Sequence, residues 1–218
     1  MDDEAAKKAF LDAMDEVASE EDLPLEALRQ IHPEFDRSRL RIGRLKRHIP
    51  KGGVGAEIGV LWGHLSEGFL RHCKPTKLYL VDPWDKLHPD KMPNQGMYSY
   101  FGRIPARLLR ARVEEIAAEN KDVVEVVHDY ADAFFETIQD DSLDWIYIDG
   151  NHKYEFVLSD LKNAKRKVKK TGVIMGDDYW FKEKNSNHGV NRALEEFLSE
   201  NDYKLVVEAP SQFVLLPS

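Results

Sequence analysis

The stretch at residues 54–63, VGAEIGVLWG, constrains the fold of this chain more than any other segment. Residues 54–58 have the character of a strand, and the glycines at 59 and 63 open a loop before a helix predicted over 65–72. Glycine lets a loop backbone approach a ligand closely, because it has no Cβ. The free N–H groups at a helix start favour an anionic group. The stretch therefore predicts an α/β fold with a small-ligand site after this strand.

A second predicted strand, residues 77–81, ends in Asp82. An acidic residue at that position can bind the hydroxyls of a ribose. The dinucleotide fingerprint G-x-G-x-x-G is absent, since Gly55, Gly59 and Gly63 stand four residues apart. These glycines have a second interpretation, in which they only permit a tight turn between strand and helix.

Composition limits the class of protein. The chain has 218 residues, 42% of them hydrophobic and 32% charged, which fits one α/β domain with a full core. The net charge is −8, so the chain lacks the overall positive charge that is typical of nucleic-acid-binding proteins. No apolar run is long enough for a membrane helix. The single cysteine, Cys73, excludes an internal disulfide, and the acidic N-terminus does not resemble a signal peptide. We therefore expect a cytoplasmic protein.

The pattern of the first fifty residues predicts an N-terminal helical cap over 1–50, followed by the main domain over 51–218, with the break at Pro50-Lys51-Gly52-Gly53. Within the cap, residues 37–48 interleave arginines and lysines with apolar residues. Such a helix could attract an anionic acceptor or partner, or it could simply present a solvated face.

The rest of the chain alternates predicted strands and helices. A helix over 105–120 precedes a strand over 123–127, which ends in His128-Asp129-Tyr130. The remaining predicted elements are a helix at 131–138, an apolar strand from 143, a helix at 154–170, a strand at 173–175 after a Thr171-Gly172 turn, a helix at 189–199, and strands at 204–208 and 212–216. The last two strands are joined by a short turn and predict a hairpin, so the sheet has five parallel strands closed by a hairpin.

Several motifs in order resemble one family. The loop Glu57-x-Gly59-x-x-x-Gly63 with the distal Asp82 resembles the first motifs of class I methyltransferases that use S-adenosylmethionine (SAM). The segments IDGNHKY at 148–154, GVIMGDDY at 172–179 and GVNRA at 189–193 follow the pattern of the methyltransferase type 24 family. The resemblance covers about residues 50–205. It implies a Rossmann-like sheet in the order 3-2-1-4-5-7-6, with the last hairpin strand antiparallel.

The resemblance also implies roles in cofactor binding. The glycine loop and Glu57 would hold the methionyl end of SAM, Asp82 the ribose, and Asp129 the adenine. A compatible role for Asp129 is to cap the following helix. The complete set of implied cofactor-binding residues is Glu57, Gly59, Gly63, Asp82, Asp129 and Asp149.

Three acids, Asp149, Asp177 and Asp178, follow adjacent predicted strands, at the edge where open α/β sheets bind ligands. Carboxylates this close repel one another, and a divalent cation relieves that cost. An all-oxygen set is typical of magnesium, calcium or manganese. Asp177 and Asp178 could alternatively form a turn that caps a loop.

His152 follows Asp149 by three residues, and this arrangement resembles metal-dependent O-methyltransferases of antibiotic sugars, such as the macrocin and mycinamicin enzymes. The resemblance implies that a metal holds the acceptor hydroxyls while His152, as the catalytic base together with Asp149, takes the proton. The alternative for His152 is a residue that packs locally at a helix start.

The sequence therefore predicts a SAM-dependent methyltransferase that acts on a small hydroxylated acceptor, with Mg²⁺ as the candidate metal. A non-catalytic SAM-fold binding or regulatory protein is the first alternative. An NAD-dependent oxidoreductase is the second, and the missing fingerprint and the hairpin argue against it. The expected partner is the small-molecule acceptor rather than nucleic acid or a membrane, and a homo-oligomer is left open.

Overall fold

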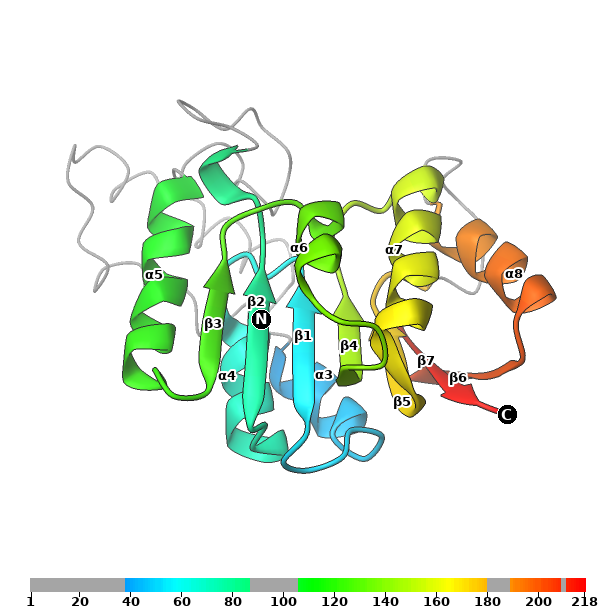
Figure 1. Cartoon of the computed structure of the whole chain (residues 1–218), viewed down its shortest axis with the longest axis horizontal. Coiled ribbons are helices and arrows are strands. Elements are labelled where there is room, and N and C mark those ends of the chain that lie inside the picture. The colour runs from blue at the N-terminus through cyan, green and yellow to red at the C-terminus, as the bar shows by residue number, and fades with distance from the viewer. Residues whose placement is uncertain (1–37, 87–105, 180–188, 209–210) are drawn as a thin grey trace, which may run out of the picture.

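The computed structural model describes residues 38–86, 106–179, 189–208 and 211–218 (Figure 1). Within these ranges seven strands form one sheet in the order β3-β2-β1-β4-β5-β7-β6, which confirms the predicted order. Neighbouring strands from β3 to β5 are parallel, and β7 runs antiparallel to both β5 and β6. The strands are β1 (Val54–Ile58), β2 (Lys77–Val81), β3 (Val124–Val127), β4 (Leu143–Ile148), β5 (Val168–Gly176), β6 (Tyr203–Glu208) and β7 (Gln212–Pro217).

Helices cover both faces of the sheet. One core cluster joins α3, α4 and α5 to the sheet, and a second cluster joins α6, α7 and α8 to the opposite face. The side chains of β4 alternate between the clusters, with Trp145 and Tyr147 in the first and Ile146 and Ile148 in the second. The helices are α3 (Ser38–Leu45), α4 (His64–Cys73), α5 (Ala106–Glu119), α6 (Ala131–Thr137), α7 (Tyr154–Lys167) and α8 (Val190–Glu200).

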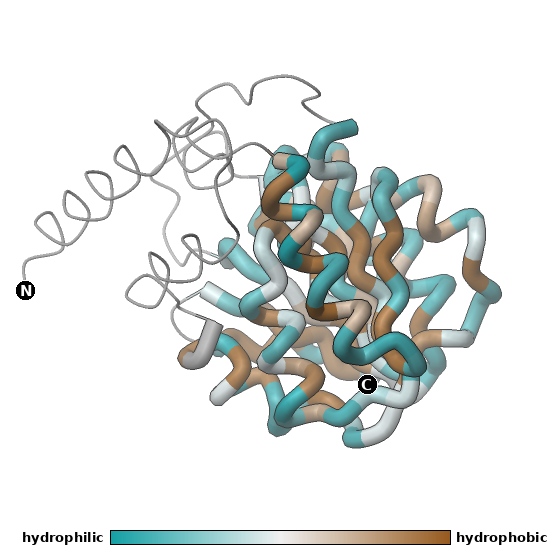
Figure 2. The backbone as a smooth tube through the Cα atoms, turned by 90° about the vertical axis from the view of Figure 1, so that its left-hand side faces the viewer, coloured by the Kyte–Doolittle hydropathy of each residue, from teal (hydrophilic) through white to brown (hydrophobic). Residues whose placement is uncertain are grey.

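The strands of the sheet are mostly apolar, as expected for parallel strands covered on both faces. In the side view of Figure 2, hydrophobic residues run through the interior of the molecule, while hydrophilic residues predominate in the outer turns. The carboxyl ends of β1, β2, β3 and β4 lie together along one edge, at the top of Figure 1. Polar residues that follow these strands are therefore brought to the same edge of the sheet.

The boundary between α7 and β5 differs from the prediction. The helix ends at Lys167 instead of residue 170, and β5 begins at once with Val168 rather than after a turn. The register shifts from Leu143↔Val168 to Trp145↔Val173, so extra residues of β5 form a bulge against β4. This irregular pairing with β4 keeps the segment in the strand, where the local sequence suggested a turn.

Only the last part of the predicted N-terminal cap falls within the described residues. There α3 packs into the same core as α4, through Ile42 and Leu45, which are 4% and 0% exposed. The division at residue 50 stays a prediction, and the part of the predicted cap at residues 1–37 lies outside the described residues. Among the described helices, none is long and apolar enough to cross a membrane.

Close packing of β1 against β4 predicts that Gly59 is required for stability. Its φ is +85°, and a Cβ there would lie 2.1 Å from the carbonyl oxygen of Asp149. We expect Gly59→Ala to lower the free energy of unfolding by about 3–5 kcal/mol, since a steric clash adds to the strain of a left-handed backbone. The measurement is urea denaturation.

Gly52 provides the matched control. Its φ is +77°, but no atom lies within 4 Å of the Cβ position. Gly52→Ala should therefore lower the free energy of unfolding by only about 1–2 kcal/mol, the cost of a left-handed backbone without a steric clash. Equal losses in the two variants would contradict the tight contact between β1 and β4.

Candidate active site

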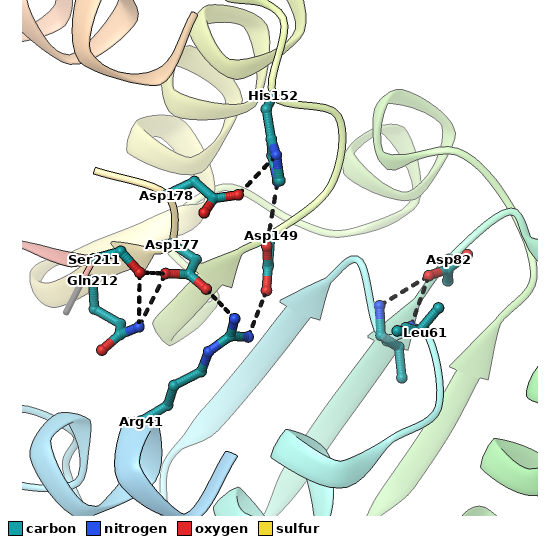
Figure 3. Close-up of polar contacts among 10 residues, drawn as sticks. Arg41, Leu61, Asp82, Asp149, His152, Asp177, Asp178, Ser211 and Gln212 are labelled. Carbon is teal, nitrogen blue, oxygen red and sulfur yellow. Dashed lines mark hydrogen bonds and ion pairs between the residues drawn. The ribbon is translucent and has the colours of Figure 1, made fainter. Parts of the chain in front are cut away.

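The glycine loop after β1 is held in shape by Asp82, which follows β2. One carboxylate oxygen of Asp82 accepts from the N–H groups of Val60 and Leu61, both at 3.0 Å (Figure 3). The other oxygen accepts from the N–H of Trp84 at 2.9 Å. Because Asp82 is only 1% exposed, these bonds supply the partners that a buried carboxylate requires. Asp82 thus fixes the loop backbone, and its predicted role toward a ribose stays a prediction.

The two glycines of the loop serve the packing of the protein itself. Gly59 leaves room for the backbone of Asp149, and a Cβ at Gly63 would lie 2.6 Å from Ile116 Cδ1 of α5. Gly63 is also the residue that precedes α4, and it brings no side chain to cap that helix. The interpretation of these glycines as turn residues is therefore supported, and it is compatible with ligand binding by the loop.

Glu57 lies beneath the loop and is 2% exposed. The hydroxyl of Ser66, in the first turn of α4, donates to its Oε2 at 2.5 Å. Burial, reinforced by the carboxylates of Asp149 and Asp82, raises the pKa of Glu57 to about 8. Glu57 therefore keeps its proton near neutral pH, and it ties the end of β1 to the start of α4.

Asp129 follows β3, as predicted, and lies on the surface. It accepts from Lys86 Nζ at 2.8 Å and from the N–H of Tyr130 at 2.9 Å. The hydrogen bond from Lys86 lowers the pKa of Asp129. Tyr130 is the residue that precedes α6, so Asp129 stands one residue before the position of a helix cap. Its predicted contact with an adenine stays a prediction.

The parallel pairing of β4 with β5 brings Asp149 and Asp178 to either side of His152 (Figure 3). His152 Nδ1 lies 2.8 Å from Asp178 Oδ2, and His152 Nε2 lies 3.4 Å from Asp149 Oδ1. One ligand atom from each of these residues lies within 4.8 Å of the other two. Two carboxylates and an imidazole at this spacing match the donors of a divalent-cation site.

Asp177 points to a different set of partners. It is 2% exposed, and its Oδ1 accepts from Ser211 Oγ at 2.6 Å and from Gln212 Nε2 at 3.0 Å. Its Oδ2 forms an ion pair with Arg41 Nη2 at 2.5 Å. Of the three acids predicted to share a metal, Asp149 and Asp178 therefore lie together with His152, while Asp177 is engaged elsewhere.

Arg41 is the site residue that sequence reasoning missed. Its Nη1 donates to Asp149 Oδ2 at 3.0 Å, so that one guanidinium joins the acids that follow β4 and β5. The interpretation of residues 37–48 as a solvated face is incorrect for Arg41. Its position beside the buried Ile42 was the only local signal, and the same signal is common at ordinary helix borders.

Positive and negative side chains alternate in this cluster. Burial raises the pKa of Asp149 to about 6, although His152 and Arg41 favour its charged form. Burial also works against a charge on His152, but hydrogen bonds to Asp149 and Asp178 outweigh it and raise the pKa to about 10. A proton on His152 is thus held firmly between two carboxylates.

The raised pKa of Glu57 makes a prediction about stability and pH. A carboxyl with a pKa of about 8 in the folded state and 4.5 in the unfolded state binds more protons when folded between those values. The free energy of unfolding therefore falls as the pH rises through this window, by about 1.4 kcal/mol for each unit of pKa difference. Glu57→Gln should show a flatter dependence in denaturant melts between about pH 5 and pH 8. Parallel curves for the two proteins would contradict a protonated Glu57.

A family model described as a methyltransferase domain, of type 24, matches residues 56–179, more than half of the chain. No curated protein matches the chain.

Solved structures share the fold at low identity. A Corynebacterium glutamicum protein is 13% identical, with 96% of each chain covered and a TM-score of 0.58. A precorrin-6y C5,15-methyltransferase from Geobacter metallireducens is 14% identical, with 83% of this chain and 86% of that chain covered and a TM-score of 0.55. A SAM-dependent methyltransferase from Aquifex aeolicus is 14% identical, with 89% and 97% covered and a TM-score of 0.53. With its match to the family model and its sheet in the order of class I methyltransferases, this chain belongs to the type 24 methyltransferase domain family.

Proposed function

We propose that this protein transfers a methyl group from SAM to a hydroxyl group of a small acceptor. The observation that carries the proposal is the contact between the glycine loop and the acid cluster. Gly59 of the loop packs against the backbone of Asp149, whose side chain faces His152. A methyl donor held by the loop would therefore lie next to groups able to orient a hydroxyl and accept its proton.

The loop has the features that SAM requires. Its backbone is fixed by Asp82, and the helix that follows starts without a side-chain cap from Gly63, which suits the carboxylate of a methionyl group. We propose that Gly59 and Gly63 with Glu57 hold this end, that Asp82 and Asp129 hold the ribose and the adenine, and that Asp149 closes the site. When bound, SAM supplies an electrophilic methyl group.

The cluster of Asp149, His152 and Asp178 also fits a divalent cation, because one donor atom from each residue lies within 4.8 Å of the other two. We propose that Asp149 and Asp178 would hold the ion, with Mg²⁺ or Mn²⁺ as candidates, while the buried Asp177 pairs with Arg41 beside them. Such an ion lowers the pKa of an acceptor hydroxyl.

His152 is the proposed proton acceptor. Without a metal, the two flanking carboxylates keep the imidazole protonated. Once a divalent cation on Asp149 and Asp178 offsets their charge, His152 would be neutral and able to take the acceptor's proton. Asp178 holds the imidazole through Nδ1, and the longer contact of Asp149 with Nε2 would give way to the acceptor hydroxyl when Asp149 binds the cation. Methyl transfer itself then needs mainly an in-line arrangement of donor and acceptor oxygen.

Cofactor binding separates this proposal from its alternatives. In calorimetry, SAM and S-adenosylhomocysteine should bind, and NAD should not. Asp82→Ala should weaken SAM binding by about 1–3 kcal/mol, because the loop loses its charged anchor. Asp85→Ala is the matched control, since Asp85 pairs with Arg110 beside the site. Equal affinity of the Asp82 variant and the wild type would contradict this assignment.

Turnover tests the acceptor chemistry. Release of S-adenosylhomocysteine would be measured with a panel of small hydroxylated compounds, and with transfer RNA as the contrasting acceptor. His152→Ala should lower turnover by roughly 10²–10⁴-fold, the range for a lost general base. His72→Ala, a change on the far end of α4, should leave turnover intact.

Chelation tests the metal separately. A strong chelator should abolish turnover and leave SAM binding in place, because the proposed metal and cofactor residues differ apart from Asp149. Full turnover in excess chelator would refute the metal. Turnover on RNA alone would refute the small acceptor, and SAM binding without turnover on any acceptor would favour a regulatory protein.

A further inference from the structure

Arg41 lies across the ends of β4 and β5, although it belongs to α3, far away in the sequence (Figure 3). Its two terminal nitrogens contact two different carboxylates, Asp149 at 3.0 Å and Asp177 at 2.5 Å. The Arg41 side chain is 29% exposed and that of Asp177 is 1% exposed. Because the N–H groups of a guanidinium form a rigid planar fork, this double contact fixes the orientation of all three side chains.

The helix that carries Arg41 is anchored by residues that follow this arginine in the chain. Ile42 and Leu45 are buried in the core shared with α4. Just after the helix, His48 Nε2 lies 2.7 Å from Glu208 Oε1 of β6, and Arg47 Nε donates to the same oxygen at 3.1 Å. Since Glu208 is 4% exposed, these contacts also neutralise a buried charge. These contacts therefore hold α3 in a position that keeps the Arg41 side chain beside Asp149 and Asp177.

We propose that Arg41 is a positioning residue whose positive charge lies between Asp149 and Asp177. It would confine a divalent cation to the side of His152 and Asp178. This inference rests on the proposed function for the presence of such a cation. It adds that the segment before the matched methyltransferase domain supplies part of the site.

Asp149 is the residue that the two cations would share. Its Oδ2 accepts from Arg41, while its Oδ1 faces His152. A positive charge in contact with a shared carboxylate weakens the attraction of that carboxylate for a second cation, and partial burial strengthens the effect. The second oxygen of Asp177 also points to Arg41. Loss of the guanidinium would therefore free one oxygen of each acid for a metal.

The test is a Mn²⁺ titration of the full chain, followed by the electron paramagnetic resonance signal of free Mn²⁺, which needs no acceptor. Arg41→Gln should lower the Mn²⁺ dissociation constant about tenfold or more. Lys46→Ala is the matched control, because it removes the same charge from an exposed position after α3 and should leave the constant unchanged. Arg41→Lys keeps the charge but loses the planar fork, so its constant should fall between those of the wild type and Arg41→Gln.

Loss of one partner from a buried ion pair can unfold a domain. The titration is therefore repeated on the double variant Arg41→Gln/Asp177→Asn, which lacks both partners, and on Asp177→Asn alone. The double variant should bind Mn²⁺ more tightly than the single variant, since Asp149 is freed in it.

The role of Arg41 would be overturned if Arg41→Gln had the same Mn²⁺ dissociation constant as the wild type and the double variant the same constant as Asp177→Asn. The metal site itself would still stand. An absence of Mn²⁺ binding in every variant would overturn the metal and this inference together, while SAM binding remains a separate measurement.

Discussion

The arrangement of the candidate site depends above all on the free-energy cost of burying several carboxylates at one edge of the sheet. A parallel sheet places the residues at the carboxyl ends of its strands side by side, and several of those residues here are acids. The cost of burial is offset in a different way for each acid. Glu57 keeps a proton, Asp82 accepts from backbone N–H groups, Asp149 and Asp178 flank His152, and Asp177 pairs with Arg41. These separate solutions fix the loop, the imidazole and α3 relative to one another.

The sheet could be predicted from the sequence because its strands are local and strongly patterned. The predicted bounds of β1 and β2 agree with the structure at every residue, and the hairpin followed from the short turn between β6 and β7. The boundary between α7 and β5 could not be predicted, because it depends on pairing with β4. The bulge opposite Asp144 extends β5 into a stretch with the composition of a turn. Tertiary pairing thus overrides a local preference at this point.

The candidate site divides in the same way. Asp149, His152 and Asp178 lie together because all three stand within four residues of the ends of the paired strands β4 and β5, so strand order and spacing were sufficient to group them. The orientation of Asp177 depends on Ser211 and Gln212 of the hairpin, which no local pattern connects to it. Arg41 depends on the packing of a separate helix against α4. Side chains that reach the site from another element leave no periodic signal in their own segment, and this explains why the sequence revealed the acids and missed their cation.

The position of Arg41 changes how the N-terminal segment relates to the methyltransferase domain. A helix that only covered a finished domain could be altered without consequence for the chemistry. Here the same turn of α3 carries Ile42, which packs in the core, and Arg41, which reaches the acids after β4 and β5. The packing of α3 therefore sets the distance between a guanidinium and Asp149. Since Asp149 also contacts His152, the electrostatics of the candidate site become a property of the core packing around α3.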